Sequence, residues 1–191
     1  TLGVMTNNRF HFGVGVSPWY EDFLATGERW EKRGKRMDEQ IDILKGLMNG
    51  EYFSYKGEFY DIPELKLCPA PTKPVPILIG GHSKLALKRA ARVGDGWISA
   101  GLSLEETKNL IDQINDFRSE FGTLDQPNFQ FQVMGESAYS PEGIKQLEEL
   151  GATEVIVAFR NTYEGGPDER TLDGMIAEIN WYAEEVIHKS K

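Results

Sequence analysis

Cysteine and histidine are scarce in this chain of 191 residues, which contains one cysteine and three histidines. A single cysteine excludes an internal disulfide and fits a reducing, cytoplasmic compartment. Cys68 stands next to Pro69, without a CxxC pair or a nearby base, so we expect a structural thiol rather than a nucleophile. The histidines are scattered over positions 11, 82 and 188, and neither HxH nor HExxH occurs. The sequence therefore predicts no metal site.

Long apolar runs and an excess of basic charge are also absent. No apolar stretch approaches the roughly 18 residues of a membrane-spanning helix, and no signal-peptide pattern is present. The formal net charge is -9 and the isoelectric point is about 4.9, whereas binding to nucleic acid requires clustered Lys and Arg. Basic residues do gather at 29–36 and 84–92, in the manner of solvated helix faces. We therefore expect neither a membrane nor a nucleic-acid partner.

Several catalytic fingerprints are missing as well. The sequence has no GxGxxG, no GxxxxGK[ST] and no GxSxG, so a Rossmann fingerprint, a Walker loop and a nucleophile elbow are excluded. Carboxylates are plentiful but fall mostly on predicted helix faces, so they assign no acid–base pair. Asp95, between two glycines, is interpreted as a turn or capping residue rather than a base.

What the sequence does contain is an alternation of short apolar strands and amphipathic helices. Strands are predicted at about 9–16, 75–80, 96–100, 129–138 and 154–159. Helix starts are marked by Ser83, by a capping box at Ser103 and Glu106, and by Ser140 before a proline. This order predicts a parallel sheet covered by helices, although periodicity alone leaves an open sheet and a partial barrel as alternatives. We expect one α/β domain over 1–191, with a hairpin and proline-rich insertion at about 51–74.

Two of the predicted strands end in residues with little or no side chain. Gly80–Ser83 follows a strand and precedes a helix, where unpaired N–H groups and a partial positive charge suit a phosphate. Ligands of parallel α/β folds bind outside the carboxyl ends of the strands. A tight turn without a ligand explains the same residues equally well. Gly13–Ser17 ends another strand and suits a flat ring, but close packing explains that segment too.

Four segments, taken in their order and spacing, resemble the luciferase-like monooxygenase family. They are RFHFGVGVSPWYEDF, RGKRMDEQIDILKGLMNGEYFSYKGEFYDI, PAPTKPVPILIGGHSKLALKRAARVGDGWI and GATEVIVAF. The chain is most similar to the branch of coenzyme F420 (deazaflavin)-dependent oxidoreductases. The resemblance implies a TIM-barrel-type (β/α)8 fold, of which this chain would supply the fourth to eighth strands. We therefore expect a barrel that is incomplete at its N-terminal side, with five parallel strands.

The resemblance also implies a cofactor, coenzyme F420 or FMN, and the residues that bind it. Those residues are Gly15, Val16, Ser17, Glu21, Gly80, Gly81, His82 and Ser83. The segment 15–17 matches the ring or ribityl contact region, Glu21 falls near the cofactor tail, and 80–83 matches the phosphate-binding segment. Pro18 stands where some relatives carry a carboxylate proton donor, so the catalytic residues stay unassigned. The implied partners are a small-molecule substrate and further copies of the chain in a homo-oligomer.

Three functions remain open at this point. The leading hypothesis is an oxidoreductase that transfers a hydride between reduced deazaflavin or flavin and a small organic substrate, with oxygen activation as a further option for FMN. The second is a catalytically inactive cofactor-binding or structural fragment, because five strands cannot close an eight-stranded barrel. The third is a non-redox barrel enzyme that binds a sugar phosphate at the same helix start.

Overall fold

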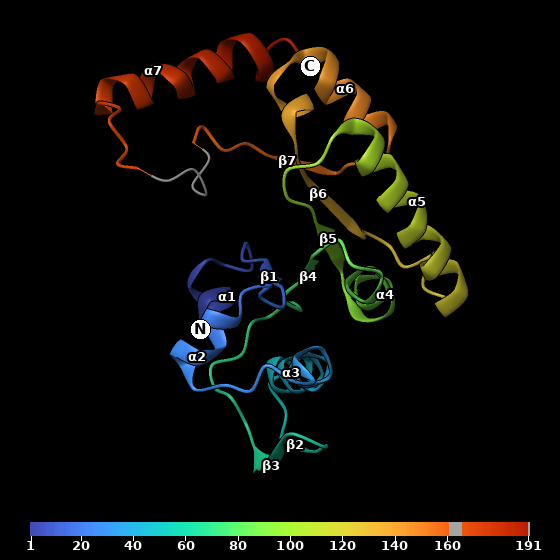
Figure 1. The fold of residues 1–191 in the computed structure, drawn as a ribbon. Coiled ribbons are helices and arrows are strands. Elements are labelled where there is room, and N and C mark those ends of the chain that lie inside the picture. Colours follow the sequence, from blue (N-terminus) through green and yellow to red (C-terminus); the bar gives the residue numbers. More distant parts are fainter. Residues whose placement is uncertain (161–165, 191) are drawn as a thin grey trace.

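The main sheet has five parallel strands in the computed structural model, which describes residues 1–160 and 166–190 (Figure 1). Their order is β1 (Phe12–Val14), β4 (Ile77–Gly80), β5 (Gly96–Ile98), β6 (Gln130–Met134) and β7 (Glu154–Ile156). Every neighbouring pair is parallel. The predicted five-stranded parallel sheet is thus confirmed. Within the described residues β1 and β7 stand at the two ends of the order, so the sheet does not close into a barrel.

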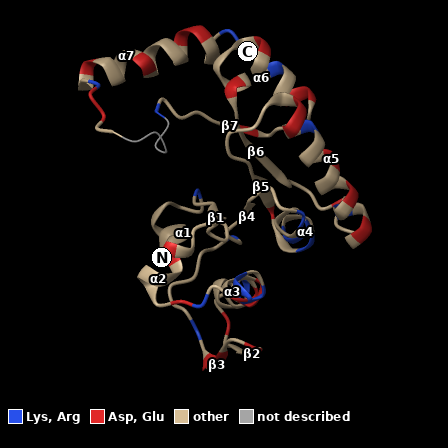
Figure 2. Ribbon diagram, in the orientation of Figure 1, with Lys and Arg blue, Asp and Glu red and all other residues tan. Residues whose placement is uncertain are grey.

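Helices follow the strands as the alternation predicts. They are α1 (Leu2–Met5), α2 (Tyr20–Thr26), α3 (Arg33–Met48), α4 (Lys84–Val93), α5 (Leu104–Phe121), α6 (Pro141–Glu149) and α7 (Leu172–Tyr182), with a 3-10 turn at Glu136–Tyr139 and a π-helical turn at Ala183–Ile187. Figure 1 shows α3, α4, α5 and α6 in succession along one side of the sheet. Figure 2 shows that most charged residues lie on the helices rather than on the strands. None of the described helices is long and apolar enough to cross a membrane.

The hydrophobic core lies between the sheet and α3, α4 and α5. Ile77 and Ile79 of β4 contribute to it, and Trp97 of β5 is fully buried. Because side chains alternate along a strand, the intervening Leu78 and Gly96 face the other side of the sheet, where they are register partners. The helix layer therefore covers one face, and the glycine-rich side of β1 and β4 belongs to the opposite face.

The helix starts follow their local signals closely. Ser83 accepts a hydrogen bond from the Ala86 N–H at 3.2 Å, and the capping box between Ser103 and Glu106 is present. Asp95 accepts from the Ile77 N–H at 2.9 Å and so joins the start of β5 to the start of β4. The two helix caps are predictable because each depends on groups three residues apart in the sequence.

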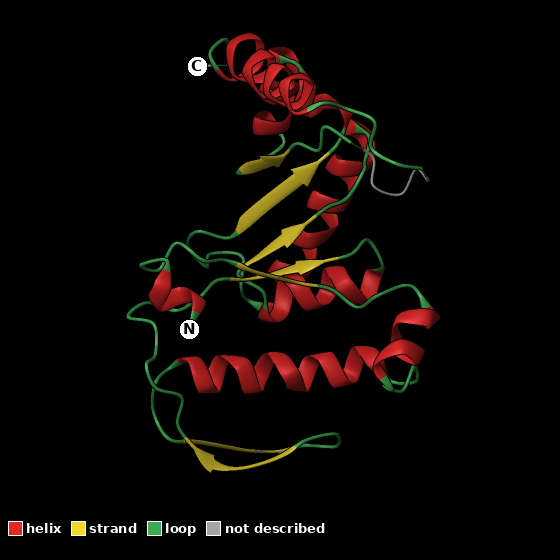
Figure 3. Cartoon of the chain, turned by 90° about the vertical axis from the view of Figure 1, so that its left-hand side faces the viewer, coloured by secondary structure: helices red, strands yellow, loops and turns green. Residues whose placement is uncertain are grey.

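The predicted hairpin is also present, as β2 (Phe53–Lys56) and β3 (Asp61–Leu65). Figure 3 shows it on the far side of α3 from the main sheet. The carboxylate of Glu39 on α3 accepts three backbone N–H bonds from residues 58–60, at 2.6, 3.0 and 3.1 Å. A carboxylate that accepts several N–H groups holds a turn firmly, so α3 positions the hairpin.

All five strand predictions were longer than the observed strands: β4 begins at Ile77, β5 ends at Ile98 and β7 ends at Ile156. The strand predicted over 9–16 is paired only from Phe12 to Val14, because β4 is its one partner strand among the described residues and Asn7 and Asn8 adopt positive φ just before it. The strand predicted over 129–138 ends at Met134, after which the chain enters the 3-10 turn. The short helices α1 and α2 were not predicted separately, since neither has the length that makes a periodic pattern readable.

The apolar face of α7 and of the π-helical turn that follows it is covered only at its C-terminal end. Tyr182 is buried and its hydroxyl donates to the Ala138 carbonyl at 2.8 Å, and Val186 is fully buried. Leu172, Ile176 and Ile179, in contrast, are 70%, 47% and 55% exposed. Figure 1 shows α7 extending away from the row formed by α3 to α6. An apolar face that remains exposed at the end of the chain agrees with a sheet that does not close.

Candidate functional site

The two small-residue segments meet at the carboxyl ends of β1 and β4. These strands are parallel neighbours, and Val14 is the register partner of Ile79, so Gly15 and Gly80 follow at the same edge. A Cβ atom built on Gly15 would lie 3.7 Å from the Gly80 carbonyl oxygen. The structure therefore brings two predicted segments, 15–17 and 80–83, together. Main chain packs against main chain there and leaves a surface without side-chain bulk.

Gly81 is the residue whose backbone most requires glycine. Its φ of +118° lies in the region that L side chains rarely adopt, and a Cβ there would stand 3.1 Å from the Ala86 Cβ. The indole Nε1–H of the buried Trp97 donates to the Gly81 carbonyl at 2.9 Å. The turn between β4 and α4 is thus held from the core through the Gly81 carbonyl.

The first turn of α4 has the chemistry of an anion site. The N–H groups of Lys84 and Leu85 have no partner within the helix, as in the first turn of any helix, while that of Ala86 is taken by Ser83. The first turns of α5, α6 and α7 carry acidic residues, whereas that of α4 carries none. An acid-free helix start with bare glycine backbone beside it fits a phosphate group. The residues present therefore fit the phosphate end of a flavin or deazaflavin cofactor.

His82 has a partner other than a ligand. Its Nε2 accepts a hydrogen bond from the Ala100 N–H at 3.1 Å, so the ring bridges from the β4–α4 turn to the β5–α5 turn. Burial lowers the pKa of His82, while the carboxylate of Glu106 acts in the opposite direction. The pKa of Glu106 is itself lowered by its hydrogen bonds with Ser103. The lowered pKa favours the neutral imidazole, and a direct contact between His82 and a phosphate stays a prediction.

Ser17 and Glu21 lie beyond the end of β1. The Ser17 hydroxyl donates to Asp22 Oδ2 at 2.5 Å and accepts from the Trp19 N–H at 3.1 Å, so it stabilises the start of α2. Glu21 is exposed in the first turn of α2. No hydrogen bond or ion pair within the described ranges joins Glu21 to residues 80–83, and its place at the cofactor tail remains a prediction.

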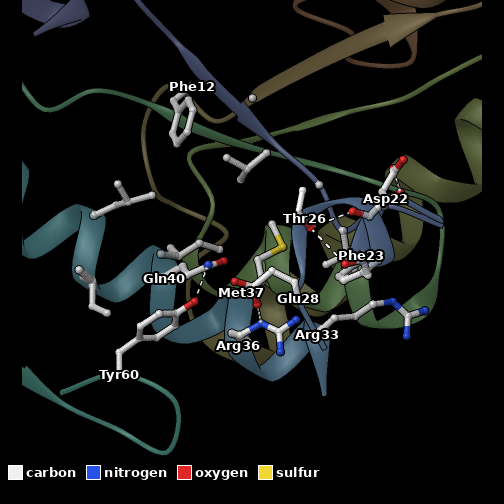
Figure 4. Close-up of a pocket in the computed structure, with 18 of the residues that line it drawn as sticks. Phe12, Asp22, Phe23, Thr26, Glu28, Arg33, Arg36, Met37, Gln40 and Tyr60 are labelled. Atoms are coloured by element: carbon white, nitrogen blue, oxygen red, sulfur yellow. Dashed lines mark hydrogen bonds and ion pairs between the residues drawn. The ribbon is translucent and has the colours of Figure 1, made fainter. Parts of the chain in front are cut away.

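A cavity lies along β1, and the predicted residues Gly15, Val16 and Ser17 form part of its wall. It has a volume of about 820 Å³, and the residues that line it include Phe12, Val14, Val16, Met37, Ile41, Leu44, Tyr60 and Ile62. Figure 4 shows it bounded by β1, α3 and the hairpin. Gln40 donates to the Tyr60 hydroxyl at 2.7 Å, and Arg36 lies 3.6 Å from Glu28. Sequence reasoning singled out the segment 15–17 of this wall but missed the rest of the cavity, because its other walls come from segments far apart in the chain.

This cavity is not the anion site. Residues 80–83 do not line it, and its walls are predominantly apolar. It runs along the edge of β1 that has no partner strand in the described residues. The segment 15–17 borders both this cavity and the carboxyl edge of β1 and β4, and we keep that edge as the candidate anion site. For metals, the described residues contain no group of three His, Cys, Asp or Glu side chains that could hold an ion.

The model of the luciferase-like monooxygenase family matches residues 1–139. The chain belongs to this family. The uncharacterized protein Rv0940c of Mycobacterium tuberculosis is 45% identical over 189 residues, which are 99% of this chain and 65% of that protein. The chain therefore spans about two thirds of the length of this relative. The resemblance of the four segments is confirmed.

The names of other relatives of this chain mention two kinds of cofactor, FMNH2 and F420. An FMNH2-dependent dimethylsulfone monooxygenase of Pseudomonas fluorescens is 35% identical over 118 residues, or 60% of this chain and 32% of that enzyme. An F420-dependent glucose-6-phosphate dehydrogenase of Microbacterium testaceum is 30% identical over 154 residues, or 78% of this chain and 45% of that enzyme. The F420-dependent tetrahydromethanopterin reductase of Methanopyrus kandleri shares the fold, with a TM-score of 0.72, 14% identity, and coverage of 98% of this chain and 76% of that one.

Proposed function

We propose that this chain forms the cofactor-binding part of an oxidoreductase that uses coenzyme F420 or FMN with a small organic substrate. The observation that supports this most directly is the edge where Gly15 and Gly80 meet beside the acid-free start of α4. Membership of a family whose relatives are named for F420 and FMNH2 agrees with it. Hydride transfer is the reaction that we propose, and oxygen activation is a further option if the cofactor is FMN.

Each segment of the edge has a distinct part in this proposal. The main chain of 80–83 and the first N–H groups of α4 would hold the phosphate, with Gly81 allowing close approach. The segment 15–17 would lie against the ring, since Gly15 presents no side chain. The bound cofactor supplies hydride transfer, and FMN can also supply oxygen activation. The contribution of this chain is to bind and orient the ring and to exclude water from one side of it.

A second function, cofactor binding without turnover, is favoured by one observation. β1 and β7 stand at opposite ends of the described sheet order, and Leu172, Ile176 and Ile179 of α7 are exposed. A substrate pocket at the mouth of a parallel barrel is built from loops all around the ring of strands. Five strands supply only part of that wall.

Titration of the purified chain with F420 and, separately, with FMN tests both functions. We expect the absorbance or fluorescence of at least one cofactor to change in a saturable manner. Reoxidation of the reduced, bound cofactor by small carbonyl compounds, faster than that of the free cofactor, supports the oxidoreductase. Saturable binding with no such acceleration supports the second function. Saturation by neither cofactor overturns the assignment of the edge.

The ring segment has its own test in this titration. Gly15→Val adds a side chain beside the Gly80 carbonyl, at an ordinary contact distance of 3.7 Å and without a positive φ. We expect the variant to fold normally and to bind FMN and riboflavin with equally reduced affinity, because the obstruction meets the ring. Unchanged affinity for both ligands contradicts the placement of the ring at 15–17.

A further inference from the structure

We infer that His82 is a positioning residue that locks the β5–α5 turn to the anion-binding β4–α4 turn, and that only its neutral imidazole does so. The contact that carries this is the hydrogen bond from the Ala100 N–H to His82 Nε2, at 3.1 Å. The link to ligand affinity rests on the proposed function. The lock itself does not, because it exists between two turns of the chain alone.

The two turns are held together by reciprocal side chains. Trp97 at the end of β5 donates to the Gly81 carbonyl at 2.9 Å, while His82 in the β4–α4 turn accepts from Ala100. The two rings lie near each other, with centroids 6.1 Å apart. Trp97 is immobilised by complete burial, so His82 is the partner whose state can change.

The other contacts of the β5–α5 turn point away from β4. Ser99 Oγ accepts from the Met134 N–H at 2.9 Å, and the Leu102 N–H donates to the Met134 carbonyl at 3.2 Å. Ser103 is held by Glu106 of α5. The Ala100 N–H therefore makes the polar contact through which residues 99–103 reach the anion-binding turn. When this contact is lost, β5 stays joined to Gly81 through Trp97, but the β5–α5 turn is released from His82.

The chemistry of imidazole makes this contact depend on protonation. Nε2 can accept a hydrogen bond only when it carries no proton, which places the proton of the neutral ring on Nδ1. A protonated His82 would direct Nε2–H at the Ala100 N–H, so the contact breaks. Among the charged groups, Glu106 of α5 acts on the ring, and Lys84 begins α4 two residues after His82. Burial lowers the pKa of His82, and this effect exceeds that of Glu106.

The sign of the pH dependence distinguishes this role from a direct phosphate contact. A histidine that contacts a phosphate binds it better when protonated, so affinity would rise on acidification. A histidine that positions the turn must be neutral, so affinity falls. Because the pKa of His82 is lower in the folded chain than its ordinary value of about 6.5, the contact is complete above that value and is lost as the pH falls.

The lock is tested first without a cofactor, by NMR of the isotope-labelled chain between about pH 5 and 8. We expect the ring signals of His82 and the Ala100 amide to titrate with one shared inflection, below the ordinary histidine value. In His82→Gln, whose side-chain oxygen can still accept, the Ala100 amide should stay near its high-pH position at all pH values. In His82→Leu it should stay near its low-pH position. An Ala100 amide that ignores the titration of His82 overturns the lock.

The link to the ligand is tested by FMN affinity over the same pH range. We expect the wild-type chain to lose about twofold to tenfold in affinity below the inflection, the loss of one ordinary hydrogen bond. His82→Gln should bind like the neutral wild type, and His82→Leu should be weak throughout. The phosphate of FMN also titrates near pH 6, so the profile of His82→Leu is the baseline to subtract. A corrected affinity that rises on acidification overturns the positioning role.

Failure of this inference is distinguishable from failure of the proposed function. A shared inflection at His82 and Ala100 without binding of any cofactor supports the lock, and refutes both its link to affinity and the proposed function. Cofactor binding with an independent Ala100 amide supports the proposed function and refutes the lock.

Discussion

Replacing Ser83 by aspartate separates the helix cap of α4 from its proposed role as an anion site. In the structure the Ser83 hydroxyl accepts from the Ala86 N–H at 3.2 Å. Aspartate is as good an N-cap as serine, whereas loss of a cap typically costs about 1 kcal/mol. We therefore expect the free energy of unfolding of Ser83→Asp to stay within about 0.5 kcal/mol of the wild type. The new charge, however, would stand where an anionic tail is proposed to bind.

The expected loss of affinity follows from the charges. Two unit charges about 4 Å apart repel by about 1 kcal/mol in water and about 4 kcal/mol at a protein surface of effective dielectric constant near 20. Ser83 is exposed, so the lower part of this range applies. A loss of about 1 to 2 kcal/mol corresponds to about fivefold to thirtyfold weaker binding of FMN. Riboflavin has the same ring without the phosphate, and its binding should change little.

The assay is equilibrium titration with both ligands, beside urea denaturation of each variant. Ser140→Asp is the matched control, because Ser140 caps α6 by accepting from the Gly143 N–H at 3.1 Å, away from the proposed site. It should leave the affinity for FMN unchanged. The reasoning is refuted if Ser83→Asp folds normally and binds FMN as the wild type does, or if the two aspartates weaken FMN binding equally.

Three further substitutions test the supporting structure. Trp97→Phe should lower the free energy of unfolding by about 1 to 3 kcal/mol, through lost buried volume and the lost bond to Gly81; an unchanged denaturation midpoint would contradict this. Gly81→Ala should cost about 1 to 3 kcal/mol because of its φ of +118°, which thermal melting measures; a stabilised variant would mean the turn differs. Glu39→Gln should speed proteolytic cleavage within 57–60, because the carboxylate that accepts three N–H bonds is weakened; cleavage at the wild-type rate would argue that α3 does not hold the hairpin.

Features set by local chemistry could be predicted from the sequence. The capping box at Ser103 and the cap at Ser83 depend on groups three residues apart, and both are present. The meeting of Gly15 and Gly80 could also be predicted once β1 and β4 are taken as parallel neighbours, since such strands end at the same edge of the sheet. The extent of each strand was not, because β1 is paired only as far as β4 provides a partner.

Features that join distant segments could not be predicted. The bonds from Trp97 to Gly81 and from Ala100 to His82 span 16 and 18 residues across an entire helix. No periodicity marks such a contact, although a tryptophan on the strand following the glycine turn was visible in the sequence. Apart from the segment 15–17, the cavity beside β1 was missed for the same reason, since the hairpin contributes one wall and α3 another.

Amide hydrogen exchange of the chain with FMN, compared with riboflavin, tests the central claim most directly, because the two ligands differ only in the phosphate. If the β4–α4 turn holds the anionic tail, FMN should slow exchange at 81–85 far more than riboflavin does. The amides at the start of α6 should exchange equally with both ligands. Phosphate-dependent protection that appears instead along the cavity between β1 and α3, or at neither place, would contradict the account.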